Sequence, residues 1–87
     1  MKKLFNNDPL EKEIEDYLRR KVKDAGGIAY KFSSPARRGV PDRMVILPNG
    51  CVCFVEVKRK GGMLTMLQRT EIEQLRDLGQ WVYVVYS

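Results

Sequence analysis

One stretch near the middle of the chain constrains the fold more than any other: residues 39–60, GVPDRMVILPNGCVCFVEVKRK. It holds two short apolar runs, Arg43–Leu47 and Cys51–Val57, separated by the turn residues Pro-Asn-Gly. Two strand-like runs joined by a three-residue connection that contains glycine predict a β-hairpin. Because both runs are apolar at nearly every position, we expect a sheet that is covered on both faces.

The expected turn determines which residues face each other across the hairpin. If the chain reverses about Asn49, Asp42 lies directly opposite Glu56, with the two Cβ atoms ~5 Å apart. Lys58 follows Glu56 by two residues and therefore points to the same face of the sheet. A one-residue bulge would break this pairing. Without a bulge, two carboxylates and one ammonium group meet at one edge of the sheet.

Composition narrows the classes of function. The chain has 87 residues, which we interpret as one domain spanning 1–87. Its formal net charge of +5 favours an anionic partner, and nucleic acid is the commonest one. The sequence contains no histidine. This excludes His-based catalytic triads, His-ligated zinc and nucleases that use a histidine general base.

Two features bear on cellular location. The first residues carry no long apolar run after their lysines, and no segment reaches the ~20 apolar residues that span a bilayer. Cys51 and Cys53 lie two residues apart on one strand, where they cannot easily form a disulfide, and CxC alone is no zinc signature. We therefore expect a cytoplasmic protein with two small buried thiols and no membrane partner.

Capping residues predict where the first helix begins and ends. Residues 8–11, DPLE, form a capping box with Asp8 as the N-cap, and residues 1–7 before it are expected to be flexible. The two glycines at 26–27 end the helix. Glu15 lies on the shoulder of the apolar stripe of this helix, and not at the centre of its polar face.

The second half of the chain completes an α/β fold. Thr65 is the N-cap of a second helix that stops at Gly79, and β-prone runs at 28–32 and 81–86 predict two more strands. The order α-β-β-β-α-β indicates a mixed sheet covered by helices, whose last strand runs parallel to Cys51–Val57 through a right-handed crossover. The expected apolar face of the second helix comprises Leu67, Ile72, Leu75 and Leu78.

Asp42 and Glu56 are the leading candidates for a metal site. Mg²⁺ binds a few oxygen ligands and keeps positions open for water and phosphate. The two carboxylates, with the backbone carbonyl of Val57, would supply such ligands. Alternatively, Asp42 is only a turn residue after Pro41, and Glu56 forms an exposed pair with Lys58. The metal interpretation is favoured because an acid inside the apolar run FVEV needs a partner.

Three more side chains are candidates beside the acids. Lys58 would act as a point charge for phosphate or would orient or deprotonate the attacking water; its alternative role is a solvent-facing lysine. Glu15 would approach the metal from the first helix, directly or through water. Gln68 closes the capping box T-x-x-Q, and a helix N-terminus also suits a phosphate, so both roles can coexist.

Basic residues cluster in sequence around the acids, and such a ring suits a polyanionic substrate. The candidates for DNA binding are Arg37, Arg38, Arg43, Arg59, Lys60 and Arg69.

Taken together, these motifs resemble a known family. The string GVPD at 39–42, the hairpin, the ExK of residues 56–58 and the LTxxQ of residues 64–68 resemble the PD-(D/E)xK nucleases. More narrowly, the chain is similar to the small stand-alone VRR-NUC (virus-type replication-repair nuclease) proteins of phages and bacteria. The resemblance extends from about Glu11 to Tyr86.

The resemblance implies a restriction-endonuclease-like core, dependence on Mg²⁺ or Mn²⁺, and cleavage of DNA. It also implies a homodimer, because small stand-alone nucleases of this fold, including the archaeal junction resolvases, act as symmetric dimers. It assigns the metal carboxylates to Asp42 and Glu56, the catalytic lysine to Lys58, an acidic helper to Glu15 and a supporting glutamine to Gln68.

Three hypotheses for function remain at this point. The first is a metal-dependent DNA endonuclease that acts on branched DNA, such as four-way junctions, in phage or bacterial replication and repair. The second is a non-catalytic nucleic-acid-binding module that uses the same basic residues. The third is a structural or regulatory protein with a cation site. The set of two acids and a lysine favours the first, because a pure binder gains nothing from carboxylates beside phosphate.

Overall fold

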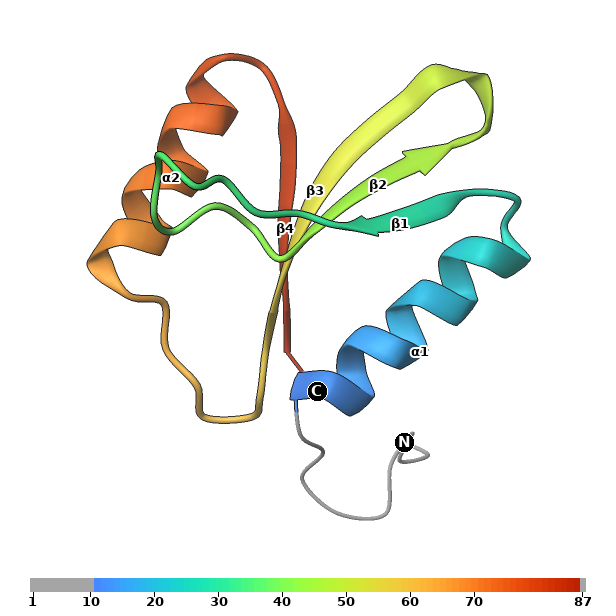
Figure 1. Ribbon diagram of the computed structural model, residues 1–87, viewed down its shortest axis with the longest axis horizontal. Coiled ribbons are helices and arrows are strands. Elements are labelled where there is room, and N and C mark those ends of the chain that lie inside the picture. The colour runs from blue at the N-terminus through green and yellow to red at the C-terminus, as the bar shows by residue number, and fades with distance from the viewer. Residues whose placement is uncertain (1–10, 87) are drawn as a thin grey trace.

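The computed structural model describes residues 11–86, and the predicted N-cap Asp8 and the expected flexible segment 1–7 lie outside that range. The predicted order α-β-β-β-α-β is confirmed (Figure 1). Neither helix within 11–86 is long and apolar enough to cross a membrane. The elements are α1 (Glu11–Asp24), β1 (Ile28–Lys31), β2 (Arg43–Leu47), β3 (Cys51–Lys58), α2 (Met66–Asp77) and β4 (Trp81–Tyr86).

The four strands form one mixed sheet in the order β1-β2-β3-β4. β1, β2 and β3 are antiparallel neighbours, and β4 runs parallel to β3 as predicted. The hairpin turns through one short 3₁₀ turn in which Asn49 has a φ of 71°. The ladder runs without a bulge from Leu47 opposite Cys51 to Arg43 opposite Val55. The next position along this register places Asp42 opposite Glu56, as the sequence predicts.

β3 lies between two hydrophobic layers because its successive side chains point to opposite faces. Val55 and Val57 pack in the layer that holds Ile14 of α1. Phe54 packs in the other layer, with Ile72 of α2. Glu56 follows Phe54 by two residues and therefore lies on the α2 side of the sheet. This alternation decides which helix can reach the acid.

The expectation that the sheet is covered on both faces is correct for β3 but wrong for the outer strands. In β1, Ile28 is 55% exposed and Tyr30 is 50% exposed. In β4, Trp81 is 65% and Tyr83 48% exposed, and their rings stack 6.4 Å apart. Two helices of this length cover only part of a four-stranded sheet, so the edge strands keep apolar side chains in water.

The expected apolar face of α2 also needs correction. Ile72 is buried as predicted, but Leu67 is 53% and Leu78 is 78% exposed. Glu71 is buried instead, at 7% exposure. The helix is therefore turned so that an acidic side chain faces the protein, where the guanidinium of Arg37 neutralises it.

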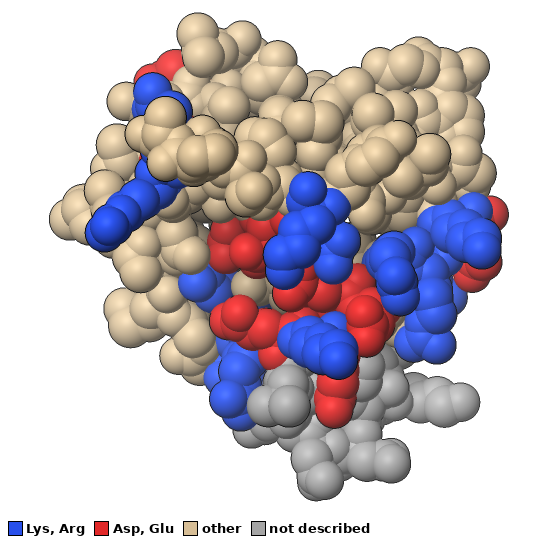
Figure 2. Space-filling model, viewed as in Figure 1, with Lys and Arg blue, Asp and Glu red and all other residues tan. Residues whose placement is uncertain are grey.

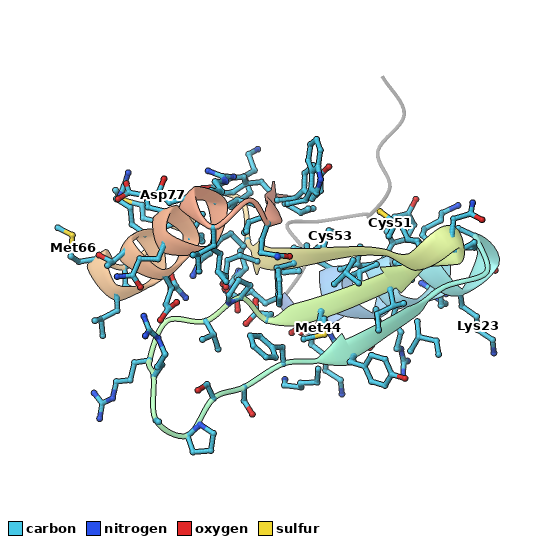
Figure 3. The ribbon with its side chains drawn as sticks, turned by 90° about the horizontal axis from the view of Figure 1, so that it is seen from above. Lys23, Met44, Cys51, Cys53, Met66 and Asp77 are labelled. Atoms are coloured by element: carbon cyan, nitrogen blue, oxygen red, sulfur yellow. The ribbon has the colours of Figure 1, made fainter. Side chains whose placement is uncertain are left out.

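The two cysteines differ in environment, although both were expected to be buried. Cys53 is buried, and this burial raises the pKa of its thiol. Cys51 lies at the hairpin end of β3 (Figure 3) and is exposed, because the hydrophobic layer on the α1 side includes Cys53 but does not extend to Cys51. The start of α2 at Met66 lies at the opposite end of the molecule.

Candidate active site

Asp42 is held at the point where the loop after β1 enters β2. The amide of Phe32 donates to the backbone carbonyl of Asp42 at 2.8 Å. The amide of Val57 donates to the Asp42 carboxylate oxygen Oδ2 at 3.1 Å. The first bond fixes the Asp42 backbone, and the second ties its side chain to β3. Both the backbone and the side chain of Asp42 are therefore hydrogen-bonded at the edge of the sheet, so Asp42 is more than a turn residue.

Glu56 is the most deeply buried charged residue of the described chain, at 1% exposure. Its carboxylate oxygen Oε2 lies 3.3 Å from Nε2 of Gln68 and 3.6 Å from Nζ of Lys58. Its other oxygen, Oε1, is buried and has no hydrogen-bond partner among residues 11–86. One half of the carboxylate is thus satisfied by the protein, and the other half is available.

Asp42 and burial together perturb the carboxyl group of Glu56. The pKa of Glu56 is raised to about 7, chiefly by burial and further by the negative charge of the neighbouring Asp42, whereas Lys58 acts in the opposite direction. Two neighbouring carboxyl groups are stabilised when a proton or a cation lies between them. The pair therefore favours a proton or a cation between its members.

This arrangement fits a hard divalent cation. The donor atoms are oxygens, one of them is buried without a partner, and the paired negative charges disfavour each other until a positive charge joins them. Within the described part of the chain, no group of three or more acidic, cysteine or histidine side chains is placed to hold a metal ion. Mg²⁺ is commonly bound through one or two carboxylates, with water and phosphate completing its shell. Two carboxylates are therefore sufficient.

Glu15 pairs with Arg43, and its approach to the metal, directly or through water, stays a prediction. Its carboxylate oxygen Oε1 lies 3.2 Å from Nε of Arg43, and both side chains are nearly buried. Arg43 also points a guanidinium nitrogen at the carbonyl of Ala29, 3.5 Å away. Arg43 was expected to bind DNA, but its guanidinium is turned inward, toward Glu15 and the carbonyl of Ala29. The two residues form an ion pair between α1 and the sheet, beside the acids.

Lys58 is buried, at 8% exposure, so the alternative of a solvent-facing lysine is wrong. Its ammonium group lies on the same side of the sheet as Glu56, as the two-residue spacing predicts. An amine on a flexible stem, held against one carboxylate oxygen, is well placed to meet an anion that approaches from outside.

Gln68 has both of the roles that the sequence allowed. Its backbone N–H donates to Thr65 Oγ1 at 3.1 Å, and its side-chain oxygen accepts from the backbone N–H of Thr65 at 2.9 Å. These two bonds complete the capping box. Its side-chain nitrogen donates to Glu56. Each polar atom of the side chain thus has one partner, and the helix cap fixes the group that holds the acid.

The basic residues divide into two sets. The guanidinium of Arg37 donates to Glu71 and Gln74 of α2, and Arg43 pairs with Glu15. Figure 2 shows Asp and Glu side chains gathered in the middle of one face, with Lys and Arg side chains around them. Arg37 stays exposed while it is bonded to α2, and the other exposed candidates are Arg38, Arg59, Lys60 and Arg69.

One residue of this neighbourhood is absent from the sequence-based candidates. Glu71 is a buried acid on α2, one turn beyond Gln68. Its sequence signal is its place directly before Ile72, on the side of the helix that enters the core. An acid at such a position needs a cationic partner. The sequence shows the need but not that Arg37 meets it.

Glu56 is expected to make the stability of the metal-free protein fall as the pH rises. The ordinary pKa of its carboxyl is 4.5, and in the folded protein the pKa is about 7. Between these pH values the folded state binds more protons than the unfolded state, so the free energy of unfolding decreases with increasing pH. Urea unfolding in EDTA from about pH 5 to about pH 8 should show this decrease, and Glu56→Gln should flatten it. If the stability of the wild type and of Glu56→Gln depends on pH in the same way, the raised pKa of Glu56 is wrong.

Comparison with known proteins agrees with this geometry. No known family model matches the sequence. A relative named "Putative nuclease p44", from Acyrthosiphon pisum secondary endosymbiont phage 1, is 52% identical over 77 residues, which cover 88% of this chain and 83% of that protein. A solved structure of a "VRR_NUC domain" is 37% identical, with a TM-score of 0.84, over 88% of this chain and 84% of that one. The resemblance inferred from the motifs is confirmed, and the chain belongs to the VRR-NUC family of nucleases.

Proposed function

We propose that this protein is a divalent-metal-dependent DNA endonuclease that hydrolyses phosphodiester bonds. We further propose that it selects branched DNA, such as four-way junctions, and works in phage or bacterial replication and repair in the cytoplasm. The observation that carries the proposal is the buried carboxyl of Glu56. It has one unpartnered oxygen, a second acid beside it and an ammonium group 3.6 Å away. No role in binding alone explains this combination.

The carboxylates of Asp42 and Glu56, with the backbone carbonyl of Val57, would hold Mg²⁺ or Mn²⁺. The N–H of Val57 donates to Asp42, and in an antiparallel strand the C=O of a residue points to the same side as its N–H, so the Val57 carbonyl faces toward the Asp42 side. When bound, the ion supplies positive charge that lowers the pKa of nearby water and offsets the charge of the phosphate. Gln68 holds Oε2 of Glu56 in place and so leaves Oε1 directed at the site.

Lys58 supplies the second positive charge. Its Nζ is the nitrogen available to stabilise the charge that develops on the phosphate as water attacks the phosphorus in line with the leaving oxygen. The same nitrogen can orient that water or take its proton. The exposed basic residues Arg38, Arg59, Lys60 and Arg69 would contact flanking phosphates, which is a sequence-independent contribution to affinity.

Removal of either acid should abolish cleavage. Asp42→Asn or Glu56→Gln should leave the fold intact and keep or tighten DNA binding, because each change removes a negative charge near phosphate. Cleavage of supercoiled and branched DNA, with and without Mg²⁺ or Mn²⁺, measures the first effect, and DNA binding in EDTA measures the second. Divalent metal should raise the melting temperature of the wild type but not of these variants.

Glu73→Gln is the matched control for these variants, because it makes the same chemical change on the exposed side of α2. It should cut DNA like the wild type. Full Mg²⁺-dependent activity in Asp42→Asn or Glu56→Gln would remove the metal assignment. Tight DNA binding by a wild-type protein that never cuts would favour the non-catalytic binding module.

Lys58→Ala should lower turnover by orders of magnitude and change metal affinity little. Lys58→Arg should restore little activity, because a planar guanidinium that stays charged cannot replace a compact, titratable amine. Single-turnover cleavage rates and Mn²⁺ titrations separate the two effects. If Arg supports cleavage as well as Lys does, the residue is only a phosphate contact.

A chain of 10.1 kDa offers little surface for a large substrate, and a C₂ homodimer is the commonest way to enlarge it. We expect a dimer of about 20 kDa, twice the chain mass, that makes symmetric cuts in four-way junctions, since a two-fold substrate matches two sites related by a two-fold axis. Light scattering at micromolar concentration measures the mass. A monomer would remove the geometric basis for this preference, and a dimer that cuts only linear duplex would reject the junction while keeping the nuclease.

A further inference from the structure

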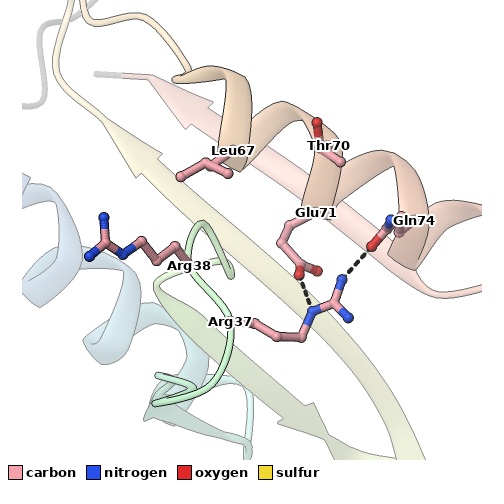
Figure 4. Close-up of a pocket in the computed structure, with 6 residues that line it drawn as sticks. All are labelled: Arg37, Arg38, Leu67, Thr70, Glu71 and Gln74. Carbon is pink, nitrogen blue, oxygen red and sulfur yellow. Dashed lines mark hydrogen bonds and ion pairs between the residues drawn. The ribbon is translucent and has the colours of Figure 1, made fainter.

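The loop between β1 and β2 packs against α2, and this contact has no role in the mechanism above. The loop delivers Asp42 to the site, and α2 delivers Gln68. Loop and helix together line an open pocket of about 210 Å³ (Figure 4). Its lining residues are Arg37, Arg38, Leu67, Thr70, Glu71 and Gln74.

Gly39 brings the loop backbone directly against the first turn of α2. A Cβ atom at this position would lie 2.5 Å from the carbonyl carbon and oxygen of Leu67 and 2.8 Å from the amide nitrogen of Gln68. Its φ of +86° also requires glycine. The obstructing atoms are backbone and cannot move aside. Gly39 is therefore in contact with the peptide bond that precedes Gln68. The loop that contains Gly39 ends at Asp42, three residues after Gly39.

Arg37 makes a second connection one helical turn further on. Its Nε donates to Oε1 of Glu71, and its Nη2 donates to the side-chain oxygen of Gln74. The Glu71 side chain is 9% exposed, whereas that of Arg37 is 58% exposed. In Figure 4 the Arg37 side chain points at these two helix residues, and Arg38 points away from them. The Nε and Nη2 edge of Arg37 is thus bonded within the protein, although the residue lies at the surface.

The two connections act on the group that holds the metal carboxylate. Gln68 and Glu71 are separated by three residues, so they lie on the same side of α2. A contact at each position fixes how far α2 stands from the loop and how it is rotated. The hydrogen bond from Gln68 to Glu56 is 3.3 Å long, so a small shift of the helix would break it.

We propose that Arg37 is a positioning residue for the metal site. Its ion pair with Glu71, together with the Gly39 contact, sets Gln68 against Glu56, and Gln68 in turn orients the Glu56 carboxylate. The inference rests on the proposed function, because it assigns a role toward the same metal. It assigns Arg37 a role other than the DNA contact expected from the sequence, because the Nε and Nη2 edge of its guanidinium is bonded to Glu71 and Gln74.

The test compares Arg37→Ala and Glu71→Met, singly and together. Methionine fills the space of Glu71 but accepts no hydrogen bond from Arg37, which is exposed enough to remain hydrated. Each single variant should weaken Mn²⁺ affinity and lower kcat by roughly tenfold, as supporting residues around metal ligands do. The double variant should have the same Mn²⁺ affinity and kcat as the more impaired of the two single variants, because both changes break the same ion pair. Arg19→Ala, which removes an exposed ion pair with Asp16 on α1, is the control and should change neither value.

A DNA contact would behave differently. In that case Arg37→Ala would raise the DNA dissociation constant in EDTA and reduce its salt dependence, with Mn²⁺ affinity unchanged. That result overturns the proposal. Arg37→Lys adds a check, since a positioning role needs the planar fork and would be impaired, whereas a simple charge contact would be retained.

Two readouts keep this test separate from the proposed function. Calorimetric titration with Mn²⁺ and the NMR signal of the Gln68 side-chain amide need no cleavage. If the wild type binds Mn²⁺ but cuts no DNA, the proposed activity fails, while a weakened Mn²⁺ affinity and a shifted Gln68 signal in Arg37→Ala still support the positioning role. If the signal and the affinity match the wild type in a folded Arg37→Ala protein, the positioning role is wrong.

Discussion

The burial of one carboxyl group inside a β-sheet is the constraint on which the rest of this structure depends. Placing Glu56 at 1% exposure costs several kcal/mol unless its charge is compensated. Lys58 and Gln68 compensate one oxygen, and Asp42 increases the cost by adding a second negative charge. The pair is therefore incomplete without a proton or a cation. A site that favours an added positive charge suits the divalent cation proposed above, which links the energetics of the fold to the proposed chemistry.

The surrounding elements are arranged around that carboxyl. Strand alternation directs Glu56 to the α2 side of the sheet, so the supporting amide comes from α2 and not from α1. The capping box holds the Gln68 side chain at the helix terminus, and the loop after β1 holds the helix itself. The ion pair of Arg43 with Glu15 joins α1 to the same region from the other side. Every helix is thus connected to the site by a polar contact as well as by its hydrophobic face.

Closeness in sequence and helical spacing do not by themselves show what a side chain contacts. Arg37 and Arg43 stand near the acids in sequence, and each pairs with an acid from a helix distant in the chain, while their DNA-binding role stays a prediction. Leu67 and Leu78 fit the helical spacing of an apolar face but lie outside the area that the sheet can cover. Cys51 is exposed and Cys53 is buried because the neighbouring hydrophobic layer includes only Cys53. Periodicity shows that a residue is able to be buried, and only the size and position of its neighbour decide whether it is.

What the sequence determined by itself was local and periodic. The turn about Asn49 set the hairpin register, and that register placed Asp42, Glu56 and Lys58 together; the Thr-x-x-Gln spacing set the cap of α2. These features involve neighbouring residues or one strand pair, where spacing alone dictates direction. The tertiary structure decided the rest: that Oε1 of Glu56 lacks a partner, that Gln68 reaches Glu56, and that Arg37 binds Glu71. Such contacts join segments that pack only when the whole sheet forms, and no pattern along the chain encodes the distance between them.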